Sequence, residues 1–254
     1  MRRFFLAPGC LAGATITLSG PEARHLAVVL RLGPGAAVEF FDGLGKVYTA
    51  ELTGVGTHQV VATVTTVRQA TEAWSPSPLT VAQALLKGKK MDLLIQKATE
   101  LGVHAFVPVI TKHCENHGQR DNQHERWQRI MIEACKQCRR TQPMLIRPAT
   151  ALADLDCSPF VHRLAAWEGE RSQGLPGGLG ERPGSICLFL GPEGGLHGDD
   201  LRLLRERLFT TVSLGHLILR GETATLAAIA IIQYQTGALL PAPDQVAGPP
   251  DEAR

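Results

Sequence analysis

The segment Ile186-Cys187-Leu188-Phe189-Leu190-Gly191-Pro192-Glu193-Gly194-Gly195 decides how the second half of the chain folds. Its apolar residues predict a buried strand, and the Gly- and Pro-rich residues that follow predict a tight loop. A second unit of this kind begins at Val212 and runs through Gly215 to Arg220-Gly221-Glu222-Thr223-Ala224, which opens an almost wholly apolar helix. Two strand–loop units side by side predict a pocket.

The two loops differ from the usual phosphate-binding loops. Neither G-x-G-x-x-G nor G-x-x-x-x-G-K-[ST] occurs in the chain, although one of these patterns normally surrounds a phosphate with backbone N–H groups. The first loop also carries Glu193, whose charge would repel a phosphate. A carboxylate at this place could instead accept hydrogen bonds from a neutral or cationic ligand.

Strands and helices alternate in the second half of the chain. Apolar runs predict strands at 79–86, 105–110, 160–167, 186–190 and 210–214, and helical periodicity predicts helices at 90–101, 125–140, 199–208 and 222–234. Alternation of this kind predicts an α/β domain with a mostly parallel sheet between two layers of helices. Ligands of such sheets bind beyond the carboxyl ends of the strands, where both glycine loops are expected.

The first 70 residues are predicted to form a separate, β-rich domain. Short β-branched runs separated by Gly, Pro and Asp predict strands at 14–18, 37–41, 47–52 and 59–64, which together suggest a small barrel. Pro21 is typical of the first turn of a short helix. The proline-broken residues 71–78 are predicted to be a linker, and the tail 241–254 is predicted to be disordered. Residues 168–185 are expected to form a surface loop.

Composition narrows the functional classes. The chain has 254 residues, 44% of them hydrophobic, and a formal net charge of +2, so it can build proper cores and is not a uniformly basic nucleic-acid coat. The start, Met1–Leu6, has two arginines, but Pro8 and Gly9 interrupt the apolar stretch that an export signal needs. No apolar run approaches the length of a spanning helix. A soluble, cytoplasmic protein is therefore expected.

The cysteines allow two interpretations. Cys135 and Cys138 have C-x-x-C spacing, and His113, Cys114 and His117 precede them, a combination that is compatible with a zinc site. However, the two cysteines also belong to an apolar stripe at helical spacing, and a second C-x-x-C is missing. Packing of the thiols in a core is the favoured interpretation, with no metal.

Five ordered motifs carry a resemblance to a known family. They are L-G-P-E-G-G at 190–195, L-G-x-x-x-L-R-x-E-T-A at 214–224, K-G-K-K-M-D at 87–92 with Q-K-A-T-E-L-G at 96–102, H-L-A-V-V-L-R at 25–31, and F-D-G at 41–43. With these motifs the chain resembles the 16S ribosomal RNA uracil-N3 methyltransferases, the ribosomal RNA small subunit methyltransferase E family of the SPOUT class. The likeness covers nearly the whole chain.

The resemblance implies a fold and an activity. The fold would be α/β, with a SPOUT methyltransferase domain over residues 79–240 whose parallel sheet contains a trefoil knot, preceded by a PUA-like, RNA-binding β-barrel over residues 1–70. The activity would be S-adenosylmethionine-dependent methylation of N3 of a specific uridine in 16S ribosomal RNA of the small subunit. A homodimer is implied, and no metal is needed because the sulfonium is already activated.

The resemblance also assigns candidate site residues. Arg220 would stabilise the anion that forms as N3 loses its proton, or it would pair with Glu222. Glu222 would be a general base or orient the arginine, and Thr223 would cap the helix or contact the base or the cofactor. The candidate cofactor-binding residues are Leu190, Gly191, Glu193, Gly194, Leu214, Gly215, Leu217 and Leu219. Trp167 and Glu168 correspond to a strand end near the cofactor.

Basic residues outside the pocket are candidates for RNA contacts. They are Arg2, Arg3, Arg24, His25, Arg31, Lys87, Lys89, Lys90, Arg139 and Arg140. Each could equally be a solvated surface charge, or a cation that answers a helix dipole. Three rival functions also remain: a SPOUT enzyme for another ribosomal or transfer RNA nucleotide, an RNA-binding module without catalysis, and a small-molecule-binding α/β protein.

Overall fold

The computed structural model describes residues 1–70, 77–114 and 122–240. Most of the predicted linker 71–78 and the whole predicted tail 241–254 therefore lie outside the described residues. The chain groups into two compact units, one formed by Met1–Glu72 with Met131–Pro143 and the other by Ala73–Ile130 with Met144–Arg254. The two units are described separately below.

The first unit contains a six-stranded, mostly antiparallel sheet in the order β1-β4-β5-β6-β3-β2. Its strands are β1 (Arg2–Phe5), β2 (Leu11–Ala12), β3 (Thr15–Ser19), β4 (Ala37–Phe41), β5 (Lys46–Val55) and β6 (Gln59–Gln69). The four predicted strands correspond to β3, β4, β5 and β6, and only β1 pairs in parallel, with β4. The two short strands β1 and β2 were not predicted.

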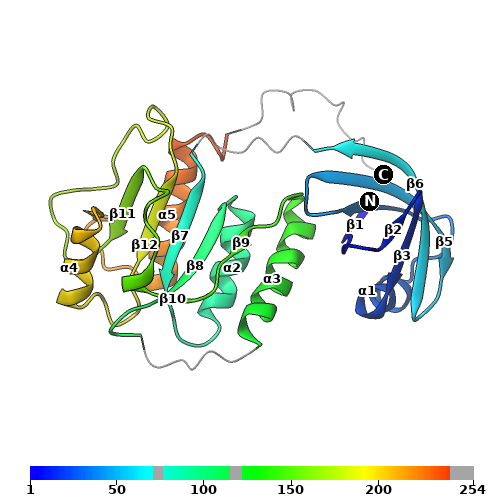
Figure 1. Ribbon diagram of the computed structural model, residues 1–254, viewed down its shortest axis with the longest axis horizontal. Helices are drawn as coiled ribbons and strands as arrows, with labels where there is room; N and C mark the ends of the chain where they lie inside the picture. The colour runs from blue at the N-terminus through cyan, green and yellow to red at the C-terminus, as the bar shows by residue number, and fades with distance from the viewer. Residues whose placement is uncertain (71–76, 115–121, 241–254) are drawn as a thin grey trace. The chain divides into compact units, whose positions relative to one another are not determined.

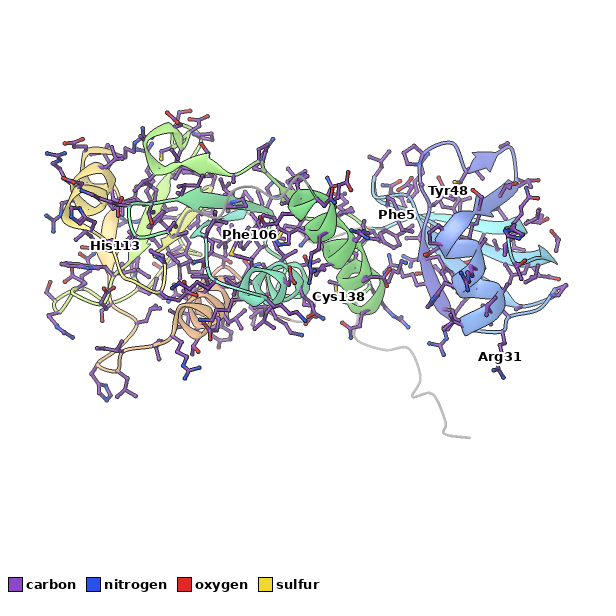
Figure 2. The ribbon with its side chains drawn as sticks, turned by 90° about the horizontal axis from the view of Figure 1, so that it is seen from below. Phe5, Arg31, Tyr48, Phe106, His113 and Cys138 are labelled. Carbon is purple, nitrogen blue, oxygen red and sulfur yellow. The ribbon has the colours of Figure 1, made fainter. Side chains whose placement is uncertain are left out.

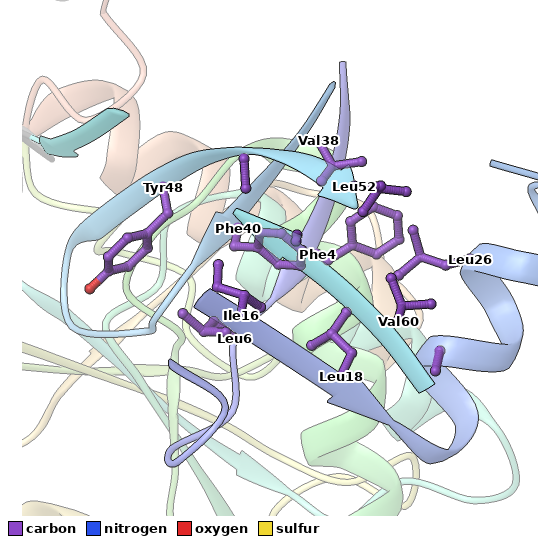
Figure 3. Packing of buried hydrophobic residues seen from close by; sticks show 13 residues of the cluster. Phe4, Leu6, Ile16, Leu18, Leu26, Val38, Phe40, Tyr48, Leu52 and Val60 are labelled. Carbon is purple, nitrogen blue, oxygen red and sulfur yellow. The ribbon is translucent and has the colours of Figure 1, made fainter. Parts of the chain in front are cut away.

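One hydrophobic core fills the first unit. Alternate residues of the strands point to the same side, so that Phe4, Ile16, Phe40 and Val60 meet in a single cluster (Figure 3). The helix α1 (Gly20–Arg24), with proline at its start as predicted, continues into the π-helical turn η1 (His25–Val29) and buries Leu26 in this cluster. The β-rich character predicted for the start of the chain is confirmed.

The second unit contains a seven-stranded sheet in which every pair of strands is parallel. The order is β10-β8-β7-β12-β11-β13, with β9 paired to β8. The strands are β7 (Leu79–Ala84), β8 (Ala105–Ile110), β9 (Leu145–Ile146), β10 (Thr150–Ala151), β11 (His162–Ala166), β12 (Ile186–Leu190) and β13 (Thr210–Val212). Every residue of β7 and β12 is buried, as expected for a sheet that is covered on both faces.

Helices cover the two faces of this sheet (Figure 1). The helix α4 (Gly198–Glu206) packs with the 3-10 turn η2 (Leu152–Asp154) over one face, where Phe189, Val109 and Leu204 share a core. The helices α2 (Lys90–Glu100) and α5 (Gly221–Gln235) contact each other. Phe106, which is fully buried, lies within the second unit (Figure 2), and α3 (Gln123–Cys138) follows β8 in the chain. The predicted α/β fold class is confirmed.

Candidate functional site

Three neighbouring strands of the second unit end level with one another. In the sheet, Ala166 of β11 pairs with Leu190 of β12 on one side and with Val212 of β13 on the other. The loops that follow these strands therefore leave the same edge of the sheet side by side. Both glycine loops therefore leave this edge, as expected, but β11 lies between their strands β12 and β13, which were predicted to be side by side.

These loops and the start of α5 surround a cavity of about 430 Å³. Seven of the eight predicted cofactor-binding residues line it, namely Leu190, Gly191, Glu193, Leu214, Gly215, Leu217 and Leu219. Gly194 is not among the lining residues, and its Cα faces His113, whose Cβ would lie 3.3 Å from an added methyl group. Gly215 has a φ of +118°, a conformation that favours glycine, and no atom lies within 4 Å of the place of its missing Cβ.

The side chain of Glu193 is held by the segment that connects β7 to α2. Its Oε1 accepts hydrogen bonds from the backbone N–H of Lys87, at 2.9 Å, and from Nζ of Lys90, at 3.1 Å. Partial burial by itself would raise the pKa of this carboxyl, but the hydrogen bonds outweigh it and lower the pKa. Glu193 is thus a carboxylate in the wall of the cavity, as a site for a cationic ligand requires.

The start of α5 brings Arg220 to the cavity. Arg220 is the N-cap residue of the helix, with an extended backbone (φ −65°, ψ 151°), and its side chain makes no capping hydrogen bond. Arg220 is exposed and lines the cavity. Glu222 and Thr223 are not among the residues that line the cavity. Because the helix begins at Gly221, the alternative that Thr223 caps it is wrong. The first turn instead directs Glu222 towards Lys90, with 3.5 Å between Oε2 and Nζ.

A third part of the wall comes from the residues after β11. Trp167, Glu168 and Arg171 line the cavity, and Arg171 had not been predicted. This segment belongs to the predicted surface loop, but its beginning is fixed by Glu170, whose carboxylate accepts hydrogen bonds from Ser172, Gln173 and the hydroxyl of Thr211. These hydrogen bonds lower the pKa of Glu170 to about 2. No spacing pattern in the sequence could have singled out Arg171.

Gly195 and Glu168 come close to each other in the same wall. Gly195 has a φ of +72°, and a Cβ added there would lie only 2.6 Å from Oε1 of Glu168. Any L-residue at this position would be strained and would also push the carboxylate away. The last glycine of the first loop thus makes room for a second acidic group of the cavity.

A fully buried polar network lies beneath the cavity. Gln83, at the end of β7, donates from Nε2 to the carbonyl oxygens of Ala84 and Gly191, at 2.9 and 3.3 Å. Its Oε1 accepts a hydrogen bond of 2.6 Å from the hydroxyl of Thr225 in α5. Neither Gln83 nor Thr225 is exposed at all. This network connects the first glycine loop to the helix that carries Arg220.

The predicted RNA-contacting residues differ in accessibility. The exposed ones are Arg2, Arg24, His25, Arg31, Lys87, Lys89 and Arg139, and Arg31 points outward from the first unit (Figure 2). Arg3 is buried to 6% exposure, pairs with Glu39 at 3.1 Å and lies over the ring of Phe41. Arg140 is buried and donates to the carbonyl of Gln142. For Arg3 and Arg140 the expectation of a phosphate contact does not fit the structure.

Of the two cysteines with C-x-x-C spacing, Cys135 fits the predicted packing in a core better than Cys138. Cys135 is fully buried, with its Sγ 3.9 Å from Sδ of Met131, and Cys138 is partly buried. His117 lies outside the described residues. Within residues 1–70, 77–114 and 122–240, no three His, Cys, Asp or Glu side chains are grouped so that they could hold a metal ion. In the same part of the chain, no helix is long and apolar enough to cross a membrane.

Comparisons with known proteins identify the family of the chain. Residues 73–233 match the family model of an RNA methyltransferase domain, and residues 18–65 match that of an RNA methyltransferase PUA domain. Proteins named ribosomal RNA small subunit methyltransferase E are similar over most of the chain. That of Synechocystis is 35% identical, covering 91% of this chain and 76% of its own, and that of Rickettsia conorii is 31% identical, covering 85% and 87%.

A solved structure shows the same fold. The ribosomal RNA small subunit methyltransferase E of Neisseria gonorrhoeae, crystallised with bound S-adenosylmethionine, superimposes with a TM-score of 0.79 at 34% identity. The match covers 92% of this chain and 97% of the Neisseria chain. Both units are therefore part of the likeness.

Proposed function

Because the chain belongs to the ribosomal RNA small subunit methyltransferase E family, we propose that it transfers a methyl group from S-adenosylmethionine to N3 of a specific uridine in 16S ribosomal RNA. One observation carries the proposal: β11, β12 and β13 end level, so that their loops and Arg220 surround a single cavity. This cavity has room for a cofactor. In its wall, the guanidinium of Arg220 supplies a permanent positive charge beside the place where the uracil would become negatively charged.

The lining of the cavity fits S-adenosylmethionine. Leu190, Leu214 and Leu219 offer apolar surface to an adenine ring, and the backbone around Gly215 is open. Glu168 and Glu193 place negative charge in the wall, which suits a ligand that carries a sulfonium and an ammonium group. When bound, this cofactor supplies an activated methyl group without a metal.

Arg220 would perform the electrostatic part of the reaction. The N3–H group of uracil is a weak acid that is largely protonated near neutral pH. The uracil ring must therefore lose this proton before its N3 atom can accept the methyl group. A guanidinium beside the ring would stabilise the resulting negative charge. Glu222 faces Lys90 instead of the cavity, which favours a role in orienting the helix start over removal of the proton.

Exposed cations would hold the RNA. On the first unit Arg2, Arg24, His25 and Arg31 are accessible, and on the second unit Lys87 and Lys89 follow the end of β7. Contacts with phosphates by such residues would make binding weaken as salt is raised. This salt dependence separates the proposal from a small-molecule-binding α/β protein.

A homodimer is part of the proposal. Near the cavity, Leu217 and Ile218 are 68% and 82% exposed, and on α5 Ile231 and Tyr234 are 41% and 65% exposed. Exposed large apolar side chains in this loop and on this helix support burial against a second copy, and light scattering after size exclusion would measure the mass. The trefoil knot and the cytoplasmic location are proposed on the family likeness alone.

The decisive experiment uses labelled S-adenosylmethionine. The protein is incubated with small ribosomal subunits from cells that lack this gene, and with free 16S RNA from the same cells, and the digested nucleosides are analysed by mass spectrometry. Label in 3-methyluridine is the expected result. Label in another nucleoside would keep the methyltransferase but change its target, and cofactor binding without any label would refute the choice of RNA.

A further inference from the structure

Lys90 lies where three elements of the second unit meet. It is the first residue of α2, it lines the cavity, and its Nζ is 3.1 Å from Oε1 of Glu193 and 3.5 Å from Oε2 of Glu222. The side chains of Lys90, Glu193 and Glu222 are 36%, 24% and 19% exposed. One ammonium group therefore connects the first glycine loop to the first turn of α5.

The base of Lys90 is rigid. The next turns of α2 are fixed in the core by Met91, Leu94 and Ile95, all of which are buried. The hydrogen bond with Glu193, together with the charges of both carboxylates, raises the pKa of Lys90, so the ammonium stays charged. A cation at this point can pair with both carboxylates at once.

The two carboxylates depend on Lys90 to different degrees. Glu193 also accepts a hydrogen bond from the backbone N–H of Lys87, which would remain without the lysine side chain. Oε2 of Glu222 is buried and has no hydrogen-bond partner among the described residues, so that the ammonium of Lys90 is its nearby positive charge. Removal of this charge would leave a poorly hydrated carboxylate uncompensated.

The first turn of α5 connects Glu222, which depends on the charge of Lys90, to the wall of the cavity. Arg220, Gly221 and Ala224 line the cavity, and Glu222 belongs to the same turn. Without the contact between Lys90 and Glu222, the first turn of α5 would lose this link to α2, and the backbone that carries Arg220 would be freer to shift. Lys90 itself would not need to touch the RNA.

We propose that Lys90 is a positioning residue, which joins Glu193 to Glu222 and thereby sets the cofactor cavity and the direction of Arg220. This inference rests on the proposed function, since it concerns the same cavity. It replaces the expectation that Lys90 contacts RNA phosphates. The two roles differ in which ligand they affect.

The test compares Lys90→Met with Lys97→Met. Lys97 is a matched control, because it lies on the same helix, is 38% exposed and pairs with Glu100. The affinity for S-adenosylmethionine is measured by calorimetry without RNA, and amide hydrogen exchange of the first turn of α5 is measured in the ligand-free protein. The KM for RNA is then followed as a function of salt concentration.

Lys90→Met is expected to raise the Kd for S-adenosylmethionine about tenfold, as loss of the partner of a half-buried carboxylate would. Exchange at Ala224 and Thr225 should become faster in this variant, and Lys90→Arg should restore most of the affinity. Lys97→Met should resemble the wild type in each measurement. The salt dependence of the KM for RNA should be the same in all four proteins.

A double variant guards the test against simple misfolding. This variant combines Lys90→Met with Glu222→Gln. If both substitutions act through the same contact, the Kd for S-adenosylmethionine of the double variant should rise by less than the product of the two single changes. An unchanged Kd in Lys90→Met, together with a salt slope reduced by about one, would overturn the inference in favour of an RNA contact. A wild-type protein that binds no S-adenosylmethionine would instead refute the proposed function.

Discussion

Thr225→Val tests the buried network beneath the cavity. The substitution keeps the shape of the side chain but removes the hydroxyl that donates to Oε1 of Gln83 at 2.6 Å. The same hydroxyl lies 2.8 Å from the carbonyl oxygen of Gly221, but it has a single proton and can donate to one acceptor at a time. In the variant, Oε1 of Gln83 stays in the interior without this donor.

The expected loss of stability follows from this orphaned oxygen. A buried acceptor without its donor costs about 1–3 kcal/mol, and the fully buried setting of both residues favours the upper part of this range. The midpoint of unfolding should fall by about 2–12 °C, at roughly 2–4 °C per kcal/mol for a unit of this size. Thermal unfolding followed by tryptophan fluorescence measures this midpoint for the right unit, because Trp127 and Trp167 both belong to it.

Two further variants make the reasoning refutable. Thr223→Val changes an exposed threonine of the same helix and should alter the free energy of unfolding by less than about 0.5 kcal/mol. Gln83→Leu combined with Thr225→Val removes both partners, so the double variant should lose less than the sum of the single losses. Equal stability of Thr225→Val and Thr223→Val, or strict additivity in the double variant, would show that the hydrogen bond contributes nothing.

Three other predictions concern the cavity wall and the segment that supports it. Arg220→Ala should slow methyl transfer about 10²–10³-fold while the Kd for S-adenosylmethionine, measured by calorimetry, stays the same; normal turnover would contradict the role of the guanidinium. Gly195→Ala should weaken cofactor binding in the same assay because of its clash with Glu168, whereas Gly88→Ala, which has a similar positive φ but open space around it, should not. Folding lowers the pKa of Glu170 from 4.5 to about 2, so the ionised carboxylate stabilises the fold above pH 4.5. The difference in urea midpoint between the wild type and Glu170→Gln should therefore disappear as the pH falls from 4.5 to 2. A difference that does not depend on pH would refute this role of Glu170.

The parts of the fold that could be predicted are those that local patterns encode. The bounds of β8 and β12 were predicted to the residue, because each is an apolar run between polar or Gly-rich segments. The helix α5 was predicted within one residue at each end for a similar reason. Strands of two residues, such as β9, are too short to show any periodicity, and only the pairing of β9 with β8 defines it as a strand.

Arg3 shows why the charge of a residue does not predict its exposure. In the sequence it stands beside Arg2 in a short basic start, which suggests a surface cation. Parallel pairing of β1 with β4 places Arg3 directly opposite Glu39, and the guanidinium is buried between this carboxylate and the ring of Phe41. The register of two strands depends on the whole sheet, so the sequence pattern around Arg3 contains no sign of it.

The residues that hold the cavity together were harder to predict than those that line it. The lining comes from two loops whose glycines and strands are contiguous in sequence. By contrast, Gln83 and Thr225 are separated by 142 positions, and Lys90 and Glu193 by 103. The tertiary fold brings these partners together, because β7 lies next to β12 and α5 contacts both α2 and β12.

The segment from the end of β7 to the start of α2 controls the cavity from two sides. Below the cavity, Gln83 connects the carbonyl of Gly191 to Thr225 of α5, and beside it Lys90 connects Glu193 to Glu222 of the same helix. Because Gln83 is fully buried, its loss should appear mainly as reduced stability, whereas loss of the partly exposed Lys90 should appear mainly as reduced affinity for the cofactor. The segment from β7 to α2 and the helix α5 are thus joined by two contacts, a buried one through Gln83 that maintains the fold and a partly exposed one through Lys90 that influences the cofactor. Comparing the loss of stability in Gln83 variants with the loss of cofactor affinity in Lys90 variants would show how far the first turn of α5 is free to move.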